Sequence, residues 1–294
     1  MKHFICLLCG VFLAGMLLGS LSACGGPGGT SSPSIDTAEP SGTAPTETEE
    51  PPNPDQQAHD ARRQAFGQLL WDVYQKGVLP DSTQLDWSGT EAASRNQFAL
   101  CDVNGDGLDE LILYWTEASS AGMMALVYGY ESGAVYQRLC EFPALTFYDN
   151  GMVQAEWSHN QGWGGRFWPY TLYRYDADNG VFLQTAGVDA WDRACTEENF
   201  PGAFPEDVDA DGDGLVYFLL TGCEWYTGER IAPDGSLYTT WSVDPVDGPD
   251  YENWREIYLE GASEIEIPIQ LLTEENIAAL GVPKPETAVE EPAG

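Results

Sequence analysis

The chain has 294 residues, of which 47 are acidic and 12 are basic, and its formal net charge is -35. A field this negative repels nucleic acid and anionic lipid head groups, so we exclude DNA, RNA and electrostatic attraction to a membrane surface. It also concentrates cations, although the charge has a second reading as a device that only keeps an exported domain soluble.

The first 23 residues have the pattern of an export signal. Lys2 precedes an apolar run from Phe4 to Leu18, and small residues follow as far as Cys24. The sequence LSAC at 21–24 resembles the bacterial lipobox. This resemblance implies a signal peptide over 1–23 and a palmitate-type lipid on Cys24, which anchors an extracytoplasmic protein to the bacterial cell membrane. The alternative is an uncleaved transmembrane anchor, because the apolar run approaches the ~20 residues that span a bilayer.

Two segments of biased composition flank the part of the chain that can fold. Residues 24–57 are rich in Gly, Pro, Ser and Thr, and a segment without large apolar side chains cannot offset its ordering entropy. We therefore predict a disordered tether there and a disordered acidic tail over 284–294. Residues 58–283 remain, and their number suits a single β-rich domain.

The folded region begins with a predicted helix at 55–77. Apolar side chains recur there with the i, i+3, i+4, i+7 spacing of one helix face, at Phe66, Leu69, Leu70 and Val73. Pro54 suits the first helical position, and Gly77 suits the end of the helix.

Strands joined by tight turns follow this helix. Runs of apolar, aromatic and β-branched residues alternate with Asn-Gly, Asp-Gly and Ser-Gly turns, a pattern typical of β-hairpins. The expected strands are 111–115, 123–130, 134–142, 144–148, 152–158, 168–175, 181–184 and 215–220. Near the end, 250–261 has helical spacing, 264–270 alternates like an edge strand, and 273–281 begins with the helix cap Thr273.

The predicted fold class is therefore α+β. An N-terminal helix packs on a mostly antiparallel β-hairpin sheet, and short helices close the C-terminal part. The turn clusters are unequally spaced along the chain, which argues against a regular propeller.

The segment 102–110 carries the clearest chemical motif. Side-chain oxygens alternate along it, a glycine allows a sharp turn, and an acid closes it at the ninth position. Such a set surrounds a hard cation, so we predict a Ca²⁺ site. Its ligands are the side chains of Asp102, Asn104, Asp106 and Glu110 and the backbone carbonyl of Leu108.

The spacing of this motif excludes an EF-hand, because position twelve holds Leu113 instead of a bidentate Glu. The pattern DxNxDGxxE between strands instead resembles the calcium loops of FG-GAP and VCBS repeats, which implies a bound Ca²⁺. The segment FALCDVNGDGLDEL is also similar to one in uncharacterised exported lipoproteins of gut bacteria, where it follows a helix. The alternative is an empty, solvated turn whose carboxylates spread into water.

A second acidic cluster forms a weaker candidate metal site. It fits the first three ligand positions in two registers, but no acid stands at the closing position. A closing carboxylate would have to come from elsewhere in the chain, and the alternative is a solvated acidic hairpin. The cluster consists of Asp207, Asp209, Asp211 and Asp213.

The segment 157–170 combines tryptophans with a flexible Gly-rich stretch. Flat aromatic faces beside polar donors are suited to stacking on sugars or to holding a peptide. The alternative is a loop whose aromatic side chains only cover the core. The candidate platform comprises Trp157, His159, Trp163, Arg166 and Trp168.

Enzymatic chemistry finds little support, which favours a binding protein over an enzyme. The patterns GxSxG, HExxH and the P-loop are absent, and only His59 and His159 follow the signal segment. Paired-carboxylate glycosidase chemistry stays open, since separation in space decides it. The exported cysteines, which allow two disulfides or act as small buried side chains, are Cys101, Cys140, Cys195 and Cys223.

Two functional hypotheses follow from the sequence. The first is a lipid-anchored surface protein whose Ca²⁺-stabilised β-rich domain binds a surface glycan or a protein. The second is a secreted carbohydrate-binding or carbohydrate-active protein that uses the Trp-rich segment 157–170.

Overall fold

The computed structural model describes residues 54–158, 165–195, 204–221, 229–231, 237–239 and 244–285. The fold is α+β, as predicted, with two five-stranded antiparallel sheets and neither a closed barrel nor a propeller in the described part. The sequence-based expectations for the signal peptide, Cys24, most of the tether, the tail from 286, His159, Trp163 and Cys223 lie outside the described residues.

The N-terminal helix forms where the apolar spacing predicts it. Helix α1 (Pro54–Lys76) has Pro at its first position and stops before Gly77, whose φ of +64° favours glycine. Its buried face packs Phe66 and Leu70 into one cluster with Phe98 of the first sheet. The short helix α2 (Thr90–Ala93) follows, and the prediction of a helix packed on a sheet is confirmed.

The first sheet has the strand order β12-β1-β2-β3-β4. Its strands are β1 (Gln97–Cys101), β2 (Glu110–Trp115), β3 (Met124–Glu131), β4 (Ala134–Glu141) and β12 (Gln270–Leu271), and the 3-10 turn η1 (Ser120–Gly122) precedes β3. Every residue of β2 is buried, because side chains alternate between two covered faces. Leu111 and Leu113 face the α1 cluster, whereas Ile112 and Tyr114 belong to the cluster shared with the second sheet.

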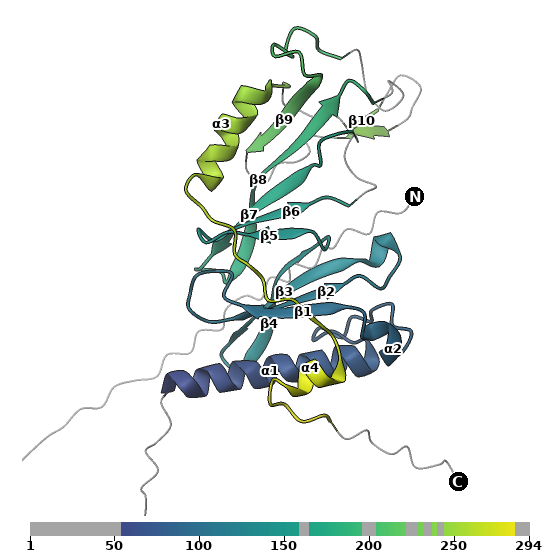
Figure 1. Cartoon of the computed structure of the whole chain (residues 1–294), viewed down its shortest axis with the longest axis vertical. Helices are drawn as coiled ribbons and strands as arrows, with labels where there is room; N and C mark the ends of the chain where they lie inside the picture. The colour runs from purple at the N-terminus through teal and green to yellow at the C-terminus, as the bar shows by residue number, and fades with distance from the viewer. Residues whose placement is uncertain are drawn as a thin grey trace, which may run out of the picture. The chain divides into compact units, whose positions relative to one another are not determined.

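The second sheet has the order β5-β6-β7-β8-β9. Its strands are β5 (Leu145–Phe147), β6 (Met152–Glu156), β7 (Tyr170–Asp176), β8 (Val181–Asp192) and β9 (Leu215–Thr221). A separate two-stranded ribbon consists of β10 (Glu229–Ile231) and β11 (Leu237–Thr239). Helix α3 (Gly248–Leu259) packs Tyr251 and Trp254 on the five-stranded second sheet, beside β9 in Figure 1.

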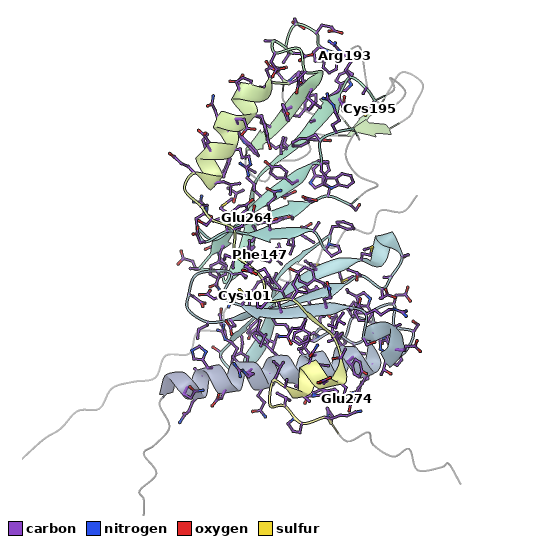
Figure 2. The ribbon with its side chains drawn as sticks, viewed as in Figure 1. Cys101, Phe147, Arg193, Cys195, Glu264 and Glu274 are labelled. Carbon is purple, nitrogen blue, oxygen red and sulfur yellow. The ribbon has the colours of Figure 1, made fainter. Side chains whose placement is uncertain are left out.

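The two sheets share one apolar cluster. Ile112 and Val127 of the first sheet pack with Phe147 and Phe182 of the second, and Figure 2 shows Phe147 where the sheets approach. Two polar bridges cross the same boundary, from Arg138 to the hydroxyl of Tyr175 and from the hydroxyl of Tyr173 to Glu141.

The last segment returns to the N-terminal helix. It passes both sheets and ends in α4 (Glu274–Ala278) beside α1 (Figure 1). Thr273 caps α4 by accepting the N–H of Asn276, as predicted. Trp71 donates to the carbonyl of Val282, and a Cβ at Gly67 would lie 2.4 Å from that valine, so glycine allows the close approach.

Two expected elements differ from the structure. Strand β8 continues to Asp192, whereas the sequence predicted a strand only as far as 184. Polar residues after 184 interrupt the apolar pattern of a strand. In the structure two of them, Asp189 and Asp192, are buried within β8. The edge strand expected at 264–270 was wrong over most of its length, since only Gln270 belongs to β12. Pro268 cannot donate a ladder hydrogen bond, and Ile265 instead bonds to the carbonyl of Phe147 as part of the returning segment.

Candidate functional site

The two Asp-rich loops share one backbone arrangement. In the first, the carboxylate of Asp102 accepts the N–H of Gly107, and in the second Asp209 accepts the N–H of Gly214, five residues on in both cases. The glycines of both loops have φ between +73° and +83°, a region that favours glycine. The common pattern D-x-(N/D)-G-D-G-L therefore folds alike and leads into a buried strand in both places, β2 and β9.

The first loop is closed by a fully buried acid. Glu110 has no exposed surface, and its Oε1 accepts from the side-chain amide of Asn104 at 3.0 Å. The same oxygen lies 3.7 Å from Nη1 of Arg62 and 4.0 Å from Nε of Arg138. Burial raises the pKa of Glu110 to about 8, although the two arginines act in the opposite direction. The position that would ligate Ca²⁺ thus already has two cationic neighbours within the protein.

The other acids of the first loop bond mainly to the loop's own backbone. Asp102 also accepts the N–H of Gly105, and Asp106 accepts that of Leu108. Asp102, Asp106 and Glu110 do not bring three ligand atoms together within the described part of the chain. Calcium binding by this loop stays a prediction.

The second loop does bring three carboxylates together. Asp209, Asp211 and Asp213 offer one oxygen each, and these oxygens lie within 4.8 Å of one another, a group that could hold a metal ion. Asp209 is 7% exposed, whereas Asp211 and Asp213 reach into solvent. Asp207, which the sequence placed in the same cluster, is not a member of the group.

Another carboxylate, which sequence reasoning missed, lies beside this group without belonging to it and comes from the start of α3. Oδ2 of Asp247 accepts the N–H groups of Ala210 and Asp211 at 3.1 and 3.3 Å. The backbone pairing of Tyr217 with Val246 brings this residue beside the loop. Oδ1 of Asp247 is shielded from solvent and finds no donor among the described residues. The only sequence signal was an Asp just before Gly-Pro at a helix start.

Two arginines flank this acidic group. Nη2 of Arg193 lies 3.4 Å from Asp209, and Arg166 donates to the carbonyl of Asp213 at 2.8 Å. Arg166 also bonds to the buried Asp192 through Nε at 2.9 Å. Burial alone would raise the pKa of Asp192, but the hydrogen bonds from Arg166 and the N–H of Ala194 outweigh it and lower that pKa. The arginines thus hold the base of the loop and partly balance its charge.

Of the expected Trp-rich platform, the structure describes Trp157, Arg166 and Trp168. Trp157 donates its indole N–H to the hydroxyl of Thr171, and Trp168 donates to the carbonyl of Trp157. Both side chains are half-buried, which supports a packing role for them. Arg166 instead bonds to Asp192 and to the carbonyl of Asp213, so the three described platform residues are held by different partners.

The three described cysteines are not joined by disulfides. Cys101 lies in the first sheet and Cys195 just after β8, far apart in Figure 2. Burial, with nearby acids, raises the pKa of both thiols, so they are poor nucleophiles.

Comparisons with protein-family models, with curated proteins and with solved structures find no match for this chain. The described helices also include none that is both long and apolar enough to cross a membrane.

Proposed function

We propose that this chain is a lipid-anchored, extracytoplasmic bacterial protein whose β-rich domain binds Ca²⁺ at its second Asp-rich loop. The Ca²⁺-stabilised end of the second sheet then presents a surface to a glycan or to another protein. The observation that carries the proposal is the group of Asp209, Asp211 and Asp213, whose oxygens lie within 4.8 Å of one another. The export signal and the LSAC sequence at 21–24 support the location.

The donor set fits a hard divalent cation. Calcium takes six to eight oxygen ligands in flexible geometry, and water completes the shell at exposed sites. Two unit charges 4.8 Å apart repel by roughly 1 kcal/mol in water and by roughly 3 kcal/mol at an effective dielectric of about 20. A divalent cation reverses this repulsion, whereas Arg193 reaches only Asp209 of the three.

Terbium luminescence tests the site directly, because Tb³⁺ replaces Ca²⁺ and emits when a nearby aromatic ring absorbs light. Tyr217 lies four residues after Asp213, on the strand that the loop leads into. We would use the mature chain from residue 24 with Cys24→Ser, which keeps it free of lipid. We expect emission that Ca²⁺ displaces and that Asp211→Asn or Asp213→Asn weakens.

Matched variants separate the alternatives. Asp178→Asn lies in the turn between β7 and β8, outside the acidic group, and should leave emission unchanged. Asp106→Asn tests the first loop in the same way. If Tb³⁺ emission is unchanged in the Asp211 and Asp213 variants but is lost with Asp106→Asn, the ion binds at the first loop. A wild-type chain without Tb³⁺ emission would refute binding at either place.

A further inference from the structure

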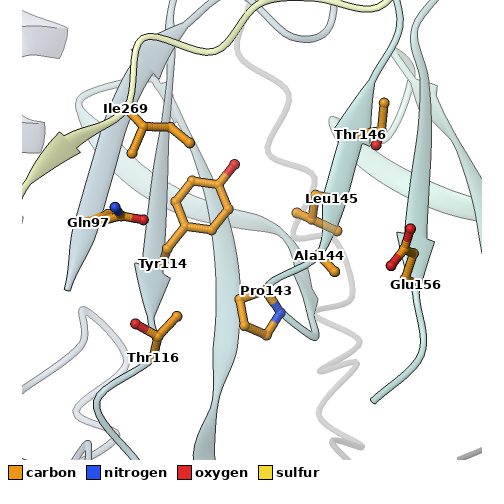
Figure 3. Close-up of a pocket in the computed structure, with 9 residues that line it drawn as sticks. All are labelled: Gln97, Tyr114, Thr116, Pro143, Ala144, Leu145, Thr146, Glu156 and Ile269. Atoms are coloured by element: carbon orange, nitrogen blue, oxygen red, sulfur yellow. The ribbon is translucent and has the colours of Figure 1, made fainter. Parts of the chain in front are cut away.

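A small groove opens between the two sheets, at the ends of β1 and β2 opposite the first Asp-rich loop. Its volume is about 270 Å³. Three distant parts of the chain converge on it (Figure 3): β1 and β2 with the residue that follows β2, the stretch from Pro143 into β5 together with β6, and the returning segment at Ile269. Only the folded chain creates this groove.

The polar groups of the groove are mostly uncharged. They are the amide of Gln97 and the hydroxyls of Tyr114, Thr116 and Thr146, with Glu156 as the one carboxylate in the lining. Although the whole chain has a net charge of -35, the groove lining contains a single charged side chain. Such groups donate and accept hydrogen bonds, so they suit a ligand that carries hydroxyls and no charge.

The groove also has an apolar side. Ile269 remains 48% exposed at its rim, and Pro143 and Leu145 contribute further apolar surface. In Figure 3 the ring of Tyr114 stands between Ile269 and Leu145. A pyranose ring has the matching character, with C–H groups on its faces and hydroxyls around its edge. The volume lies just below the range of about 300–1,000 Å³ for drug-sized ligands, so one ring fits better than a longer chain.

We propose that this groove binds one ring of a neutral sugar. Gln97 and Glu156 bond to its hydroxyls from opposite walls, and Ile269 and Tyr114 contact its apolar face. We infer that the groove binds the sugar without hydrolysing it. Glycosidases place two carboxyl groups on either side of the glycosidic bond, and the lining has only Glu156. The site is distinct from the Trp-rich segment and shares no residue with the acidic group at 209–213, so it stands independently of the proposed Ca²⁺ binding.

Saturation-transfer NMR and calorimetry with methyl glycosides of glucose, galactose and N-acetylglucosamine test the proposal on the mature chain with Cys24→Ser. For so small a ligand we expect a dissociation constant on the order of 1 mM for at least one of them. Gln97→Ala and Glu156→Gln should each weaken it about 10-fold, the loss expected for one hydrogen bond. Tyr114→Phe keeps the buried ring and tests the hydroxyl alone.

Matched controls are Gln137→Ala and Glu252→Gln, which lie at exposed positions outside the groove and should bind as the wild type does. The groove variants should keep the wild-type response to Tb³⁺, which separates failure here from failure of the Ca²⁺ proposal. The proposal is overturned if no glycoside binds, or if Gln97→Ala and Glu156→Gln bind like their controls. Loss of binding only with Trp163→Ala would overturn it as well, by placing the sugar at the Trp-rich segment.

Discussion

Asp247 connects two parts of the chain that the sequence separates by more than thirty residues. Its Oδ2 accepts two backbone N–H groups of the second Asp-rich loop, while its Oδ1 is shielded without a donor among the described residues. A shielded carboxylate oxygen without a partner raises the free energy of the folded state. A cation bound in the loop would be attracted to this charge, so Asp247 favours the bound state.

Asp247→Asn should therefore weaken Ca²⁺ binding while the domain stays folded. The amide keeps one oxygen for the N–H groups of Ala210 and Asp211, but the charge is lost. A carboxylate charge about 5 Å from a divalent cation contributes roughly 1.7 kcal/mol in water, so we expect roughly a 15-fold rise in the dissociation constant by calorimetry. Asp250→Asn, exposed in the first turn of the same helix, is the control, and an equal effect there would point to general charge alone.

Glu141 gives the stability a pH dependence. Burial raises its pKa above the usual 4.5, and the hydrogen bond from Tyr173 only partly offsets this. The unfolded chain releases the proton first, so the stabilisation is complete below about pH 4.5 and is lost as the pH rises through the raised pKa. Urea unfolding across this range should show a smaller decline for Glu141→Gln than for the wild type. Glu256→Gln, on the exposed face of α3, should retain the full decline.

At the scale of elements, Gly129 allows β4 to hold its buried arginine. A Cβ on Gly129 would lie 1.6 Å from Nε of Arg138. That guanidinium bonds to Glu131 at 2.6 Å and to Tyr175 of the second sheet, and it lies near the buried Glu110. The strand pair β3 and β4 thus carries the charge that accompanies Glu110, and it also links the two sheets.

Gly129→Ala should displace this arginine and destabilise the domain. Leaving a buried acid with less compensation costs about 3 kcal/mol, because neither water nor the opposite charge replaces the lost contact. Chemical denaturation measures the loss. Gly122→Ala is the matched control, since its nearest neighbour would be Cβ of Ala118 at 3.3 Å, and we expect a change below about 1 kcal/mol. Equal stability of the two variants would show that Arg138 moves aside freely.

The elements that the sequence predicted are those fixed by local chemistry. Helix α1 follows from its apolar spacing and from Pro54 and Gly77, and the hairpin turns follow from Asn-Gly and Asp-Gly pairs. The division of the strands into two sheets depends on which apolar faces meet, and one sequence does not contain that pairing. The end of β8 was hidden because Asp189 and Asp192 are polar, yet both are buried, and Asp192 bonds to Arg166 from another segment.

The candidate cation site was predictable to the same degree. The spacing of Asp209, Asp211 and Asp213 is local, and the sequence identified it, although it gave the first loop more weight. The distinction between the loops comes from long-range contacts. Arg62 and Arg138 approach Glu110 from α1 and β4, whereas Asp247 approaches the second loop from α3. These contacts join residues that are far apart in the sequence, so no local sequence pattern predicts them.

At the scale of the whole molecule, the net charge of -35 favours any bound cation. The described domain has one apolar cluster between α1 and the first sheet, one shared by the two sheets, and one between α3 and the second sheet. A lipid on Cys24 would hold such a domain at the membrane without an electrostatic attraction to lipid head groups. The wild type expressed in a bacterium should therefore incorporate labelled palmitate, and Cys24→Ser should abolish the label. A membrane-bound wild type without label would instead indicate an uncleaved anchor.

Calcium should stabilise the entire domain, because the second loop joins β9 to the start of α3. With a dissociation constant of about 10⁻⁴ M, typical of extracellular modules, ~10 mM Ca²⁺ adds roughly 3 kcal/mol to the free energy of unfolding. For a domain of this size that shifts the melting temperature by roughly 5–10 °C, measurable by calorimetry in Ca²⁺ and in chelator. Asp213→Asn, which weakens binding, should show a clearly smaller shift than the wild type, whereas Asp178→Asn should keep the full shift. A wild-type melting temperature that chelation leaves unchanged would contradict a stabilising ion, since a ligand that binds only the folded state must raise it.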